Sequence, residues 1–264
     1  AHERLVYERL KRAAAEAGIA AQALLIPEIV TLAEDDRARL LAAAEQLRDL
    51  GLTVEPFGAE AVAVRETPAL LGPVDCKGLI ADICDELADM MRAVKASRPR
   101  RVLEIGTARG GTLFLLCRFA APDATIVSVD LPFARNGGGY PRWKERHYRG
   151  FARPRQALHL IRANSHAKET VERVGRITGG AGFDFIFIDA DHSYEGVRCD
   201  YLNYRPLLSE GGMLALHDIL PNENDPSIEV NRFWRELESD PEVRTDTLIA
   251  DAAQGMYGIG TIKA

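Results

Sequence analysis

Arg101-Val-Leu-Glu-Ile-Gly-Thr-Ala-Arg-Gly-Gly111 is the stretch that decides the fold of this chain. The apolar residues Val102, Leu103 and Ile105 predict a short buried strand, and residues 112–120 predict a helix that starts directly after the glycines. Glycines between a strand and a helix let the backbone approach a ligand, and the N–H groups at the helix start can face that ligand. The stretch therefore predicts the opening strand-turn-helix unit of a nucleotide-binding α/β fold.

A second feature, about 20 residues further on, narrows the ligand class. Residues 124–129 predict a second strand that ends in Asp130, where a carboxylate can accept hydrogen bonds from both hydroxyls of a ribose. Two alternatives remain for the turn itself: a dinucleotide frame, with small residues at Gly106, Ala108 and Gly111, or a plain turn without a ligand.

Glu104 precedes the first glycine by two positions and is not part of the dinucleotide fingerprint. Glu104-Ile-Gly106-Thr-Ala-Arg-Gly110 followed by Asp130 resembles motifs I and II of class I S-adenosylmethionine (SAM)-dependent methyltransferases, with Ala108 where that family has a glycine. The resemblance implies a Rossmann-like, doubly wound α/β domain with a seven-stranded sheet over residues 90–264, and SAM as its cofactor. It also implies a set of SAM-binding residues: Glu104, Gly106, Thr107, Ala108, Gly110, Asp130, Asn164, Ser165 and Asp189.

Length and composition limit the function classes. The chain has 264 residues, enough for one such domain and a smaller module, and its formal charge of −6 disfavours a nucleic-acid partner for the methyltransferase part. The four cysteines form no CxxC pair, which predicts reduced thiols in a cytoplasmic protein rather than a zinc or disulfide framework. No apolar run is long enough to span a bilayer, so we expect no membrane partner.

The first third of the chain has a different pattern. A helix is expected at 3–17, a strand at 24–32, a long helix at 34–50 and two short strands at 52–56 and 61–65. This order, without a glycine-rich turn, predicts a small α+β module for packing or dimerisation.

Several blocks of this module, in the same order, resemble the C-terminal dimerisation domain of the mismatch-repair protein MutL. The likeness covers residues 1–89 and is incomplete, because the metal-binding blocks of that family are absent after Asp89. Glu3 and Glu8 match two family glutamates, but the preceding Asp-Gln-His is missing, so we expect no nicking activity. The resemblance implies a homodimer. The blocks that carry it are 1–11, Leu24-Leu-Ile-Pro27, Val54-Glu-Pro-Phe-Gly58 and Val64-Arg-Glu-Thr-Pro-Ala-Leu-Leu-Gly72.

The two resemblances meet within one predicted helix, residues 80–96, which the sequence ends at Ser97-Arg-Pro-Arg100. We therefore expect two domains, residues 1–89 and residues 90–264. No Gly- or Ser-rich linker separates them.

Residues 131–149 form a long segment with three consecutive glycines followed by basic and aromatic residues. Such a segment can be a lid, part of an acceptor pocket or a surface excursion. Tyr140, Trp143 and His147 are its candidate contacts for an acceptor.

Acids and histidines follow two further strands. A buried strand at 185–188 leads to Asp189 and His192, and a strand that starts at Gly211 ends at His217 and Asp218. The carboxyl ends of neighbouring parallel strands bind ligands in open α/β sheets, so these groups are predicted to share one crevice. Carboxylates and imidazoles there can hold a divalent cation or act as a general base.

This pattern resembles the O-methyltransferase branch that uses magnesium, and more closely the cephalosporin-hydroxylase-like and sugar or macrolide O-methyltransferase sequences. By position, the resemblance implies Mg²⁺ ligands at Asp189, His217 and Asp218, although the family often has Asp-Asn at the last two positions. Catalytic roles are predicted for His192, His217 and Asp189.

The sequence thus predicts a SAM-dependent methyltransferase, a transferase that methylates a hydroxyl of a small molecule or sugar, with possible help from Mg²⁺. Three alternatives stay open: a non-enzymatic dimerisation fragment of a mismatch-repair protein, an NAD-dependent oxidoreductase, and a hydroxylase-like protein without methyl transfer.

Overall fold

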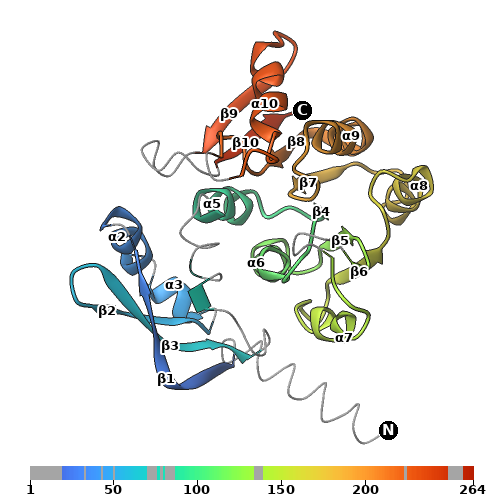
Figure 1. Ribbon diagram of the computed structural model, residues 1–264. Helices are drawn as coiled ribbons and strands as arrows, with labels where there is room; N and C mark the ends of the chain where they lie inside the picture. Colours follow the sequence, from blue (N-terminus) through green and yellow to red (C-terminus); the bar gives the residue numbers. More distant parts are fainter. Residues whose placement is uncertain are drawn as a thin grey trace, which may run out of the picture. The chain divides into compact units, whose positions relative to one another are not determined.

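The structure, a computed structural model, divides into two compact units, residues 1–84 and residues 85–264 (Figure 1). The predicted helix at 3–17 lies outside the described residues, as does most of the segment 70–86. In the part of the chain that the structure describes, no helix has the length and apolar character needed to cross a bilayer. The described residues are 20–32, 34–42, 44–49, 51–69, 76–77, 80, 87–133, 139–222, 225–248 and 258–264.

In its described residues, the first unit is a three-stranded antiparallel sheet with two short helices, as expected for a small α+β module. The strand order is β1-β3-β2, and the helices α2 and α3 lie within the range 34–50, where the sequence predicts one helix. Apolar side chains from both helices and all three strands form its core. The elements are β1 (Ala21–Thr31), α2 (Glu34–Ala42), α3 (Ala44–Asp49), β2 (Thr53–Phe57) and β3 (Ala61–Pro68).

The second unit is a seven-stranded sheet with the strand order β6-β5-β4-β7-β8-β10-β9. Strands β6, β5, β4, β7 and β8 run parallel, and β10 runs antiparallel to both β8 and β9. This is the doubly wound sheet that the sequence predicts. Its strands are β4 (Arg101–Ile105), β5 (Thr125–Asp130), β6 (Ala157–Arg162), β7 (Phe183–Ile188), β8 (Leu208–Leu216), β9 (Arg244–Leu248) and β10 (Ile259–Lys263).

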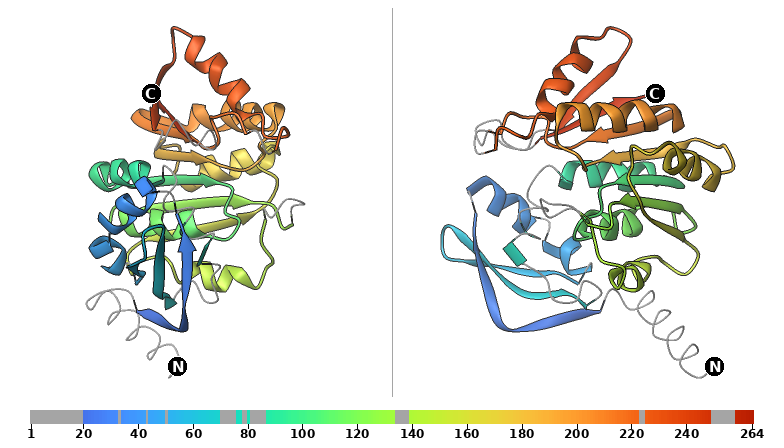
Figure 2. Two further views of the ribbon diagram at one scale, coloured as in Figure 1. Left: turned by 60° about the vertical axis from the view of Figure 1, so that its left-hand side comes forward. Right: turned by 45° about the vertical axis from the view of Figure 1, so that its right-hand side comes forward.

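Helices cover both faces of this sheet, with α5 and α6 on one side and α8 and α9 on the other (Figures 1 and 2). Alternation along β4 explains the layers, because Leu103 and Ile105 join the core formed with α8, α9 and α10, while Glu104 points to the other face. The helices are α5 (Leu87–Ser97), α6 (Gly111–Phe119), α7 (Lys144–Arg149), α8 (Lys168–Ile177), α9 (Tyr194–Tyr204) and α10 (Val230–Ser239).

The strand order reverses at β4. The chain runs from β4 outward to β5 and β6, and then returns to the opposite side of β4 with β7 and β8. Ligands of open α/β sheets bind at such a switch point, outside the carboxyl ends of the strands. The fold therefore places the glycine-rich turn after β4 and the acidic ends of β7 and β8 at one edge of the sheet.

Two local predictions differ from the structure. Helix α7 falls in the segment 131–149, for which the sequence suggested no regular structure. The sequence also predicts a helix over residues 194–208, but α9 ends at Tyr204 and the chain continues as a single 3-10 turn over Arg205–Leu207, because Pro206 has no backbone N–H to donate to a longer α-helix.

Candidate active site

The glycine-rich turn after β4 requires small residues at two positions. Gly106 has φ +95°, and a Cβ atom there would lie 1.8 Å from the backbone oxygen of Asp189. Gly110 has φ +86°, and its Cβ would lie 2.7 Å from the ring of Tyr148. Ala108, which stands where the resembled family has a glycine, also adopts a positive φ of 41°. The backbone shape of that motif is therefore retained despite the substitution.

A buried hydrogen-bond chain runs behind the turn. Glu104 and Ser128 are directly paired across β4 and β5, and the Ser128 hydroxyl donates to Glu104 Oε2 at 2.7 Å. The hydroxyls of Ser128 and Thr107 also share a hydrogen bond. Glu104 is fully buried, and its Oε1 has no hydrogen-bond partner among the described residues. Burial, reinforced by the nearby carboxylates of Asp130 and Asp189, raises the pKa of Glu104 to about 8 despite the hydrogen bond from Ser128.

Asp130 ends β5 at the edge of the turn, and its carboxylate accepts hydrogen bonds from four backbone N–H groups. Those of Thr107 and Ala108 lie 3.0 and 2.7 Å from Oδ2, and that of Leu131 lies 2.7 Å from Oδ1. The N–H of Gly139 is shared between both oxygens at 3.1 Å. Because a carboxylate offers about four lone-pair positions, a ribose bound to Asp130 must replace one of these donors. The shared, longer contact of Gly139 is the weakest of them.

The rings of Tyr140 and Tyr148 pack against each other beside the turn, and we call this pair the aromatic wall. Tyr148, in α7, is buried and donates its hydroxyl to the backbone oxygen of Ala108 at 2.9 Å. The Tyr140 ring packs edge-on against Tyr148, with ring centroids 4.9 Å apart. Sequence reasoning selected Tyr140 but missed Tyr148, because a six-residue helix of charged and aromatic residues carries no apolar periodicity. Trp143, in contrast, is 71% exposed.

The loop after β6 holds Asn164 and Ser165, two of the residues predicted to bind SAM. Asn164 is exposed, and its side-chain oxygen accepts the backbone N–H of His166 at 2.9 Å. The backbone oxygen of Ser165 accepts the Tyr204 hydroxyl at 2.8 Å. His166 Nε2 lies 3.4 Å from Oδ1 of the fully buried Asp200. The loop is thus anchored to α9 at two points.

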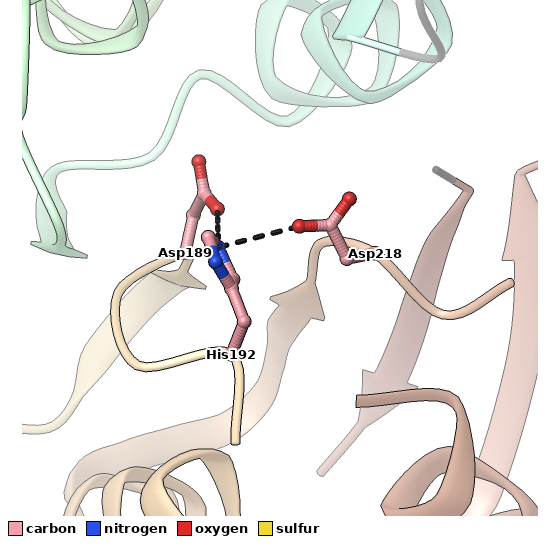
Figure 3. Close-up of side chains that lie close together, drawn as sticks. All are labelled: Asp189, His192 and Asp218. Atoms are coloured by element: carbon pink, nitrogen blue, oxygen red, sulfur yellow. Dashed lines mark hydrogen bonds and ion pairs between the residues drawn. The ribbon is translucent and has the colours of Figure 1, made fainter. Parts of the chain in front are cut away.

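The carboxyl ends of β7 and β8 bring together two carboxylates and two imidazoles. His192 Nε2 lies 3.1 Å from Asp189 Oδ1 and 3.3 Å from Asp218 Oδ2, so its ring stands between the two acids (Figure 3). Potential ligand atoms of these three residues lie within 4.8 Å of one another. His217 Nδ1 lies 3.2 Å from Asp218 Oδ1 and 3.7 Å from Asp189 Oδ1. Two oxygen donors and one imidazole suit a divalent cation.

His192, rather than the predicted His217, completes the compact three-residue set. In the sequence, His192 follows Asp189 by only three positions, and this short spacing after β7 indicates that the two side chains can lie close together. Asp191 has a different role, because its Oδ1 accepts the backbone N–H and the hydroxyl of Ser193 and so shapes the start of α9. Asp218 has a φ of +60°, an unfavourable conformation for a residue other than glycine, which is often found at functional sites.

Charges within this cluster reinforce one another. The hydrogen bond to Asp189 raises the pKa of His192 above its ordinary value, although partial burial acts in the opposite direction. Partial burial opposes ionisation of Asp189, but the charge of His217 and the hydrogen bond from His192 outweigh it and lower the pKa of that carboxyl. These two shifts favour an ionised Asp189 beside a more basic His192.

The turn and the cluster are in direct contact. The backbone N–H of Asp189 donates to the oxygen of Ile105 at 2.8 Å, and the Asp189 carbonyl occupies the space that a side chain at Gly106 would need. A ligand seated in the turn would therefore reach the acids and imidazoles without crossing another layer of the protein.

Two family models match successive, overlapping parts of the chain. The model of the MutL C terminal dimerisation domain matches residues 1–111, and the model of a methyltransferase domain matches residues 103–219. The second part is therefore similar to methyltransferase domains, and the first part is similar to the dimerisation domain of MutL. Residues 103–111 are matched by both, but β4 pairs with β5 and β7 in the seven-stranded sheet, which assigns this overlap to the methyltransferase unit.

Curated relatives match the first part only. The MutL protein of Sinorhizobium fredii (strain NBRC 101917 / NGR234) is 57% identical over 89 residues, which is 34% of this chain and 15% of that protein. The MutL protein of Phenylobacterium zucineum (strain HLK1) is 54% identical over 94 residues, 36% of this chain and 15% of that protein. The chain thus spans a small part of the MutL proteins that it matches.

Solved structures resemble the chain over most of its length. Cofactor-bound Rv0187 from MTB shares 17% identity and a TM-score of 0.51, covering 88% of this chain and 90% of that one. The O-methyltransferase TomG from Streptomyces achromogenes, in complex with SAM, shares 20% identity and a TM-score of 0.49, covering 91% and 92%. At this level of identity, the likeness to Rv0187 shows the fold.

Proposed function

We propose that residues 90–264 form a SAM-dependent methyltransferase that methylates a hydroxyl of a small molecule or sugar, assisted by a divalent cation. The observation that carries this proposal is the contact between the glycine-rich turn after β4 and the Asp-His cluster after β7 and β8. Methyl transfer requires that an acceptor hydroxyl be aligned with the methyl group of the cofactor and lose its proton. The glycine-rich turn, here called the cofactor cradle, would hold the cofactor, and the acids and imidazoles beside it would position and deprotonate the hydroxyl.

The residues of the turn fit SAM. Gly106 lets the turn pack directly against the Asp189 carbonyl, where no Cβ would fit, and Oε1 of Glu104 is a buried polar atom without a partner among the described residues. Bound SAM would supply a methyl group that its sulfonium already activates. The residues proposed to hold it are Glu104, Gly106, Thr107, Ala108, Gly110, Asp130, Asn164, Ser165 and Asp189.

The donor set after β7 and β8 fits a divalent cation, with Asp189, His192 and Asp218 as the compact set and His217 beside it. Such a cation would lower the pKa of an acceptor hydroxyl. Because His217 Nδ1 faces the carboxylates of Asp218 and Asp189, a proton on Nδ1 is favoured and Nε2 is left to accept the proton of the hydroxyl. His192 takes this role if His217 is the ligand instead.

The test measures methyl transfer from SAM to a panel of phenols, sugars and other small hydroxyl compounds, with magnesium or with a chelator. Asp189→Ala should lower turnover by roughly 100-fold or more, the scale of a lost acid-base or metal contact, while S-adenosylhomocysteine, held by the other eight proposed residues, remains largely bound. Asp246→Ala, an exposed position on β9, is the matched control and should keep its turnover. Full turnover of Asp189→Ala would reject the role of the cluster.

A second proposal concerns the first unit, which we infer to be a homodimerisation module. Leu25 and Ile26 in β1 are 105% and 82% exposed, and Phe57 at the end of β2 is 54% exposed. Exposed large apolar side chains in one small sheet are typical of an interface. Light scattering should show a dimer for the intact chain and a monomer for Leu25→Asp/Ile26→Asp; a monomeric intact chain would contradict the proposal.

A further inference from the structure

The Tyr140 hydroxyl is a buried polar group that the fold does not use. The side chain is 1% exposed, and among the described residues no group makes a hydrogen bond to its hydroxyl. A buried hydroxyl without a hydrogen-bond partner lowers the stability of the fold. A bound ligand that accepts a hydrogen bond from it would explain why the residue is a tyrosine and not a phenylalanine.

The rest of Tyr140 is held firmly by other groups. Its backbone N–H donates to the oxygen of Leu131 at 3.2 Å, and its backbone oxygen accepts from Nε of Arg162 at 3.0 Å. The Arg162 guanidinium also lies over the ring, 5.7 Å from its centroid, and the Tyr148 ring packs against its edge. The ring is therefore fixed without any contribution from the hydroxyl.

The neighbours of Tyr140 are the groups that line the cofactor cradle. Gly139, the preceding residue, donates to Asp130, and Tyr148 donates to Ala108. Burial raises the pKa of the Tyr140 phenol above its ordinary value, and the nearby carboxyls of Glu145 and Asp130 add to this effect. A phenol is protonated at neutral pH even at its ordinary pKa of about 10, so the Tyr140 hydroxyl has a proton with which it can donate a hydrogen bond.

We propose that the Tyr140 hydroxyl donates a hydrogen bond to a ribose hydroxyl of the nucleoside cofactor bound in the glycine-rich turn. A ribose hydroxyl that donates its own proton to Asp130 keeps lone pairs that need a donor, and the phenol of Tyr140 supplies one. If the ribose replaces the Gly139 N–H at Asp130, Tyr140 can stay in place, because Arg162 and Tyr148 hold it independently. This inference rests on the proposed function.

Tyr148 provides an internal comparison. It lies in the same aromatic wall and is equally buried, but its hydroxyl already donates to Ala108. Removal of the two hydroxyls should therefore have opposite consequences. Tyr140→Phe loses no internal hydrogen bond and should keep or raise the thermal midpoint, whereas Tyr148→Phe loses one and should lower the midpoint.

The experiment uses the full chain and two probes, S-adenosylhomocysteine and 5′-methylthioadenosine, titrated by calorimetry. Both contain the ribose, but only the first has the amino-acid part. Tyr140→Phe should raise the dissociation constants of both by about 5- to 10-fold, the range for one hydrogen bond lost to a ligand, with an unchanged or higher thermal midpoint.

Three results would overturn the inference: equal affinity of Tyr140→Phe and the intact chain for both probes, a loss confined to S-adenosylhomocysteine, or a clearly lower midpoint of Tyr140→Phe. In each of these cases the intact chain still binds S-adenosylhomocysteine, so the proposed function stands. If the intact chain binds neither probe, the proposed function and the inference both fail.

Discussion

Replacement of Glu104 by glutamine gives a sharp test of the electrostatics of the site. Glu104 is fully buried, and its pKa is raised from 4.5 to about 8, mainly because burial penalises the charged form. Glutamine has nearly the same shape and never ionises. The variant therefore isolates the effect of the proton on this side chain.

The sign follows from proton linkage. A group whose pKa is higher in the folded state contributes its full stability below the unfolded value of 4.5 and loses that contribution as the pH rises towards 8. Each pH unit in this window is worth about 1.4 kcal/mol. Between about pH 5 and pH 7, the free energy of unfolding of the intact chain should fall by roughly 3 kcal/mol relative to Glu104→Gln.

Urea unfolding, followed by tryptophan fluorescence, measures this difference in the free energy of unfolding for the second structural unit, residues 85–264. The two tryptophans, Trp143 and Trp234, both lie in residues 85–264, so their signal reports on the sheet that contains Glu104. Glu238→Gln, at an exposed position of α10, is the control and should follow the pH dependence of the intact chain. If the intact chain and Glu104→Gln give parallel stabilities at both pH values, Glu104 is not held in its neutral form, and the account of the site's electrostatics is wrong.

Three further substitutions test separate parts of the site. Gly106→Ala should cost more than about 2 kcal/mol of unfolding free energy and abolish binding of S-adenosylhomocysteine, because its Cβ meets the Asp189 carbonyl; denaturation and calorimetry measure the two effects. Ala108→Gly should stabilise the fold by about 1 kcal/mol in the same denaturation assay, because it relieves a positive φ. The hydrogen bond to Asp200 raises the pKa of His166, so that pair stabilises the fold below about pH 6.5 and loses its effect as the pH rises. His166→Ala should lower the thermal midpoint by about 2–4 °C in acid and less in alkali.

Controls separate these effects from general strain. Gly179 also has a positive φ, of 63°, but a Cβ added there would meet nothing within 4 Å, so Gly179→Ala reports the backbone cost alone and should retain ligand binding. If Gly106→Ala and Gly179→Ala lose the same unfolding free energy, the contact between a Cβ at position 106 and the Asp189 carbonyl is not the cause of the loss. A lower stability of Ala108→Gly, or a midpoint change in His166→Ala that does not depend on pH, would contradict the other two explanations.

The strands of the second unit could be predicted because parallel strands covered on both faces are nearly continuous apolar runs, as in Phe183–Ile188. The same logic located Asp189 and Asp218, since polar groups that end neighbouring parallel strands must meet at one edge. No local pattern indicates that β10 runs antiparallel to its neighbours; the resemblance to class I methyltransferases, which implies an antiparallel last strand, is the only source of that expectation.

Other features depend on contacts between distant residues that no local pattern records. Tyr148 reaches Ala108 across 40 positions of the sequence, and saturation of Asp130 involves the turn after β4 together with Gly139. The closer fit of His192 than His217 to the two acids depends on side-chain geometry within tight turns. Sequence spacing alone could not rank the two histidines.

Calorimetric titration of the intact chain with S-adenosylhomocysteine, and separately with NAD⁺, shows which nucleoside cofactor the glycine-rich turn binds. No variant is needed, which matters because Asp130 also accepts four backbone hydrogen bonds and its loss would disturb the turn regardless of any ligand. We expect one S-adenosylhomocysteine to bind per chain, with a dissociation constant on the order of micromolar, about −8 kcal/mol, and no heat of binding from NAD⁺. Binding of NAD⁺ in its place, or no binding of either compound, would contradict this expectation.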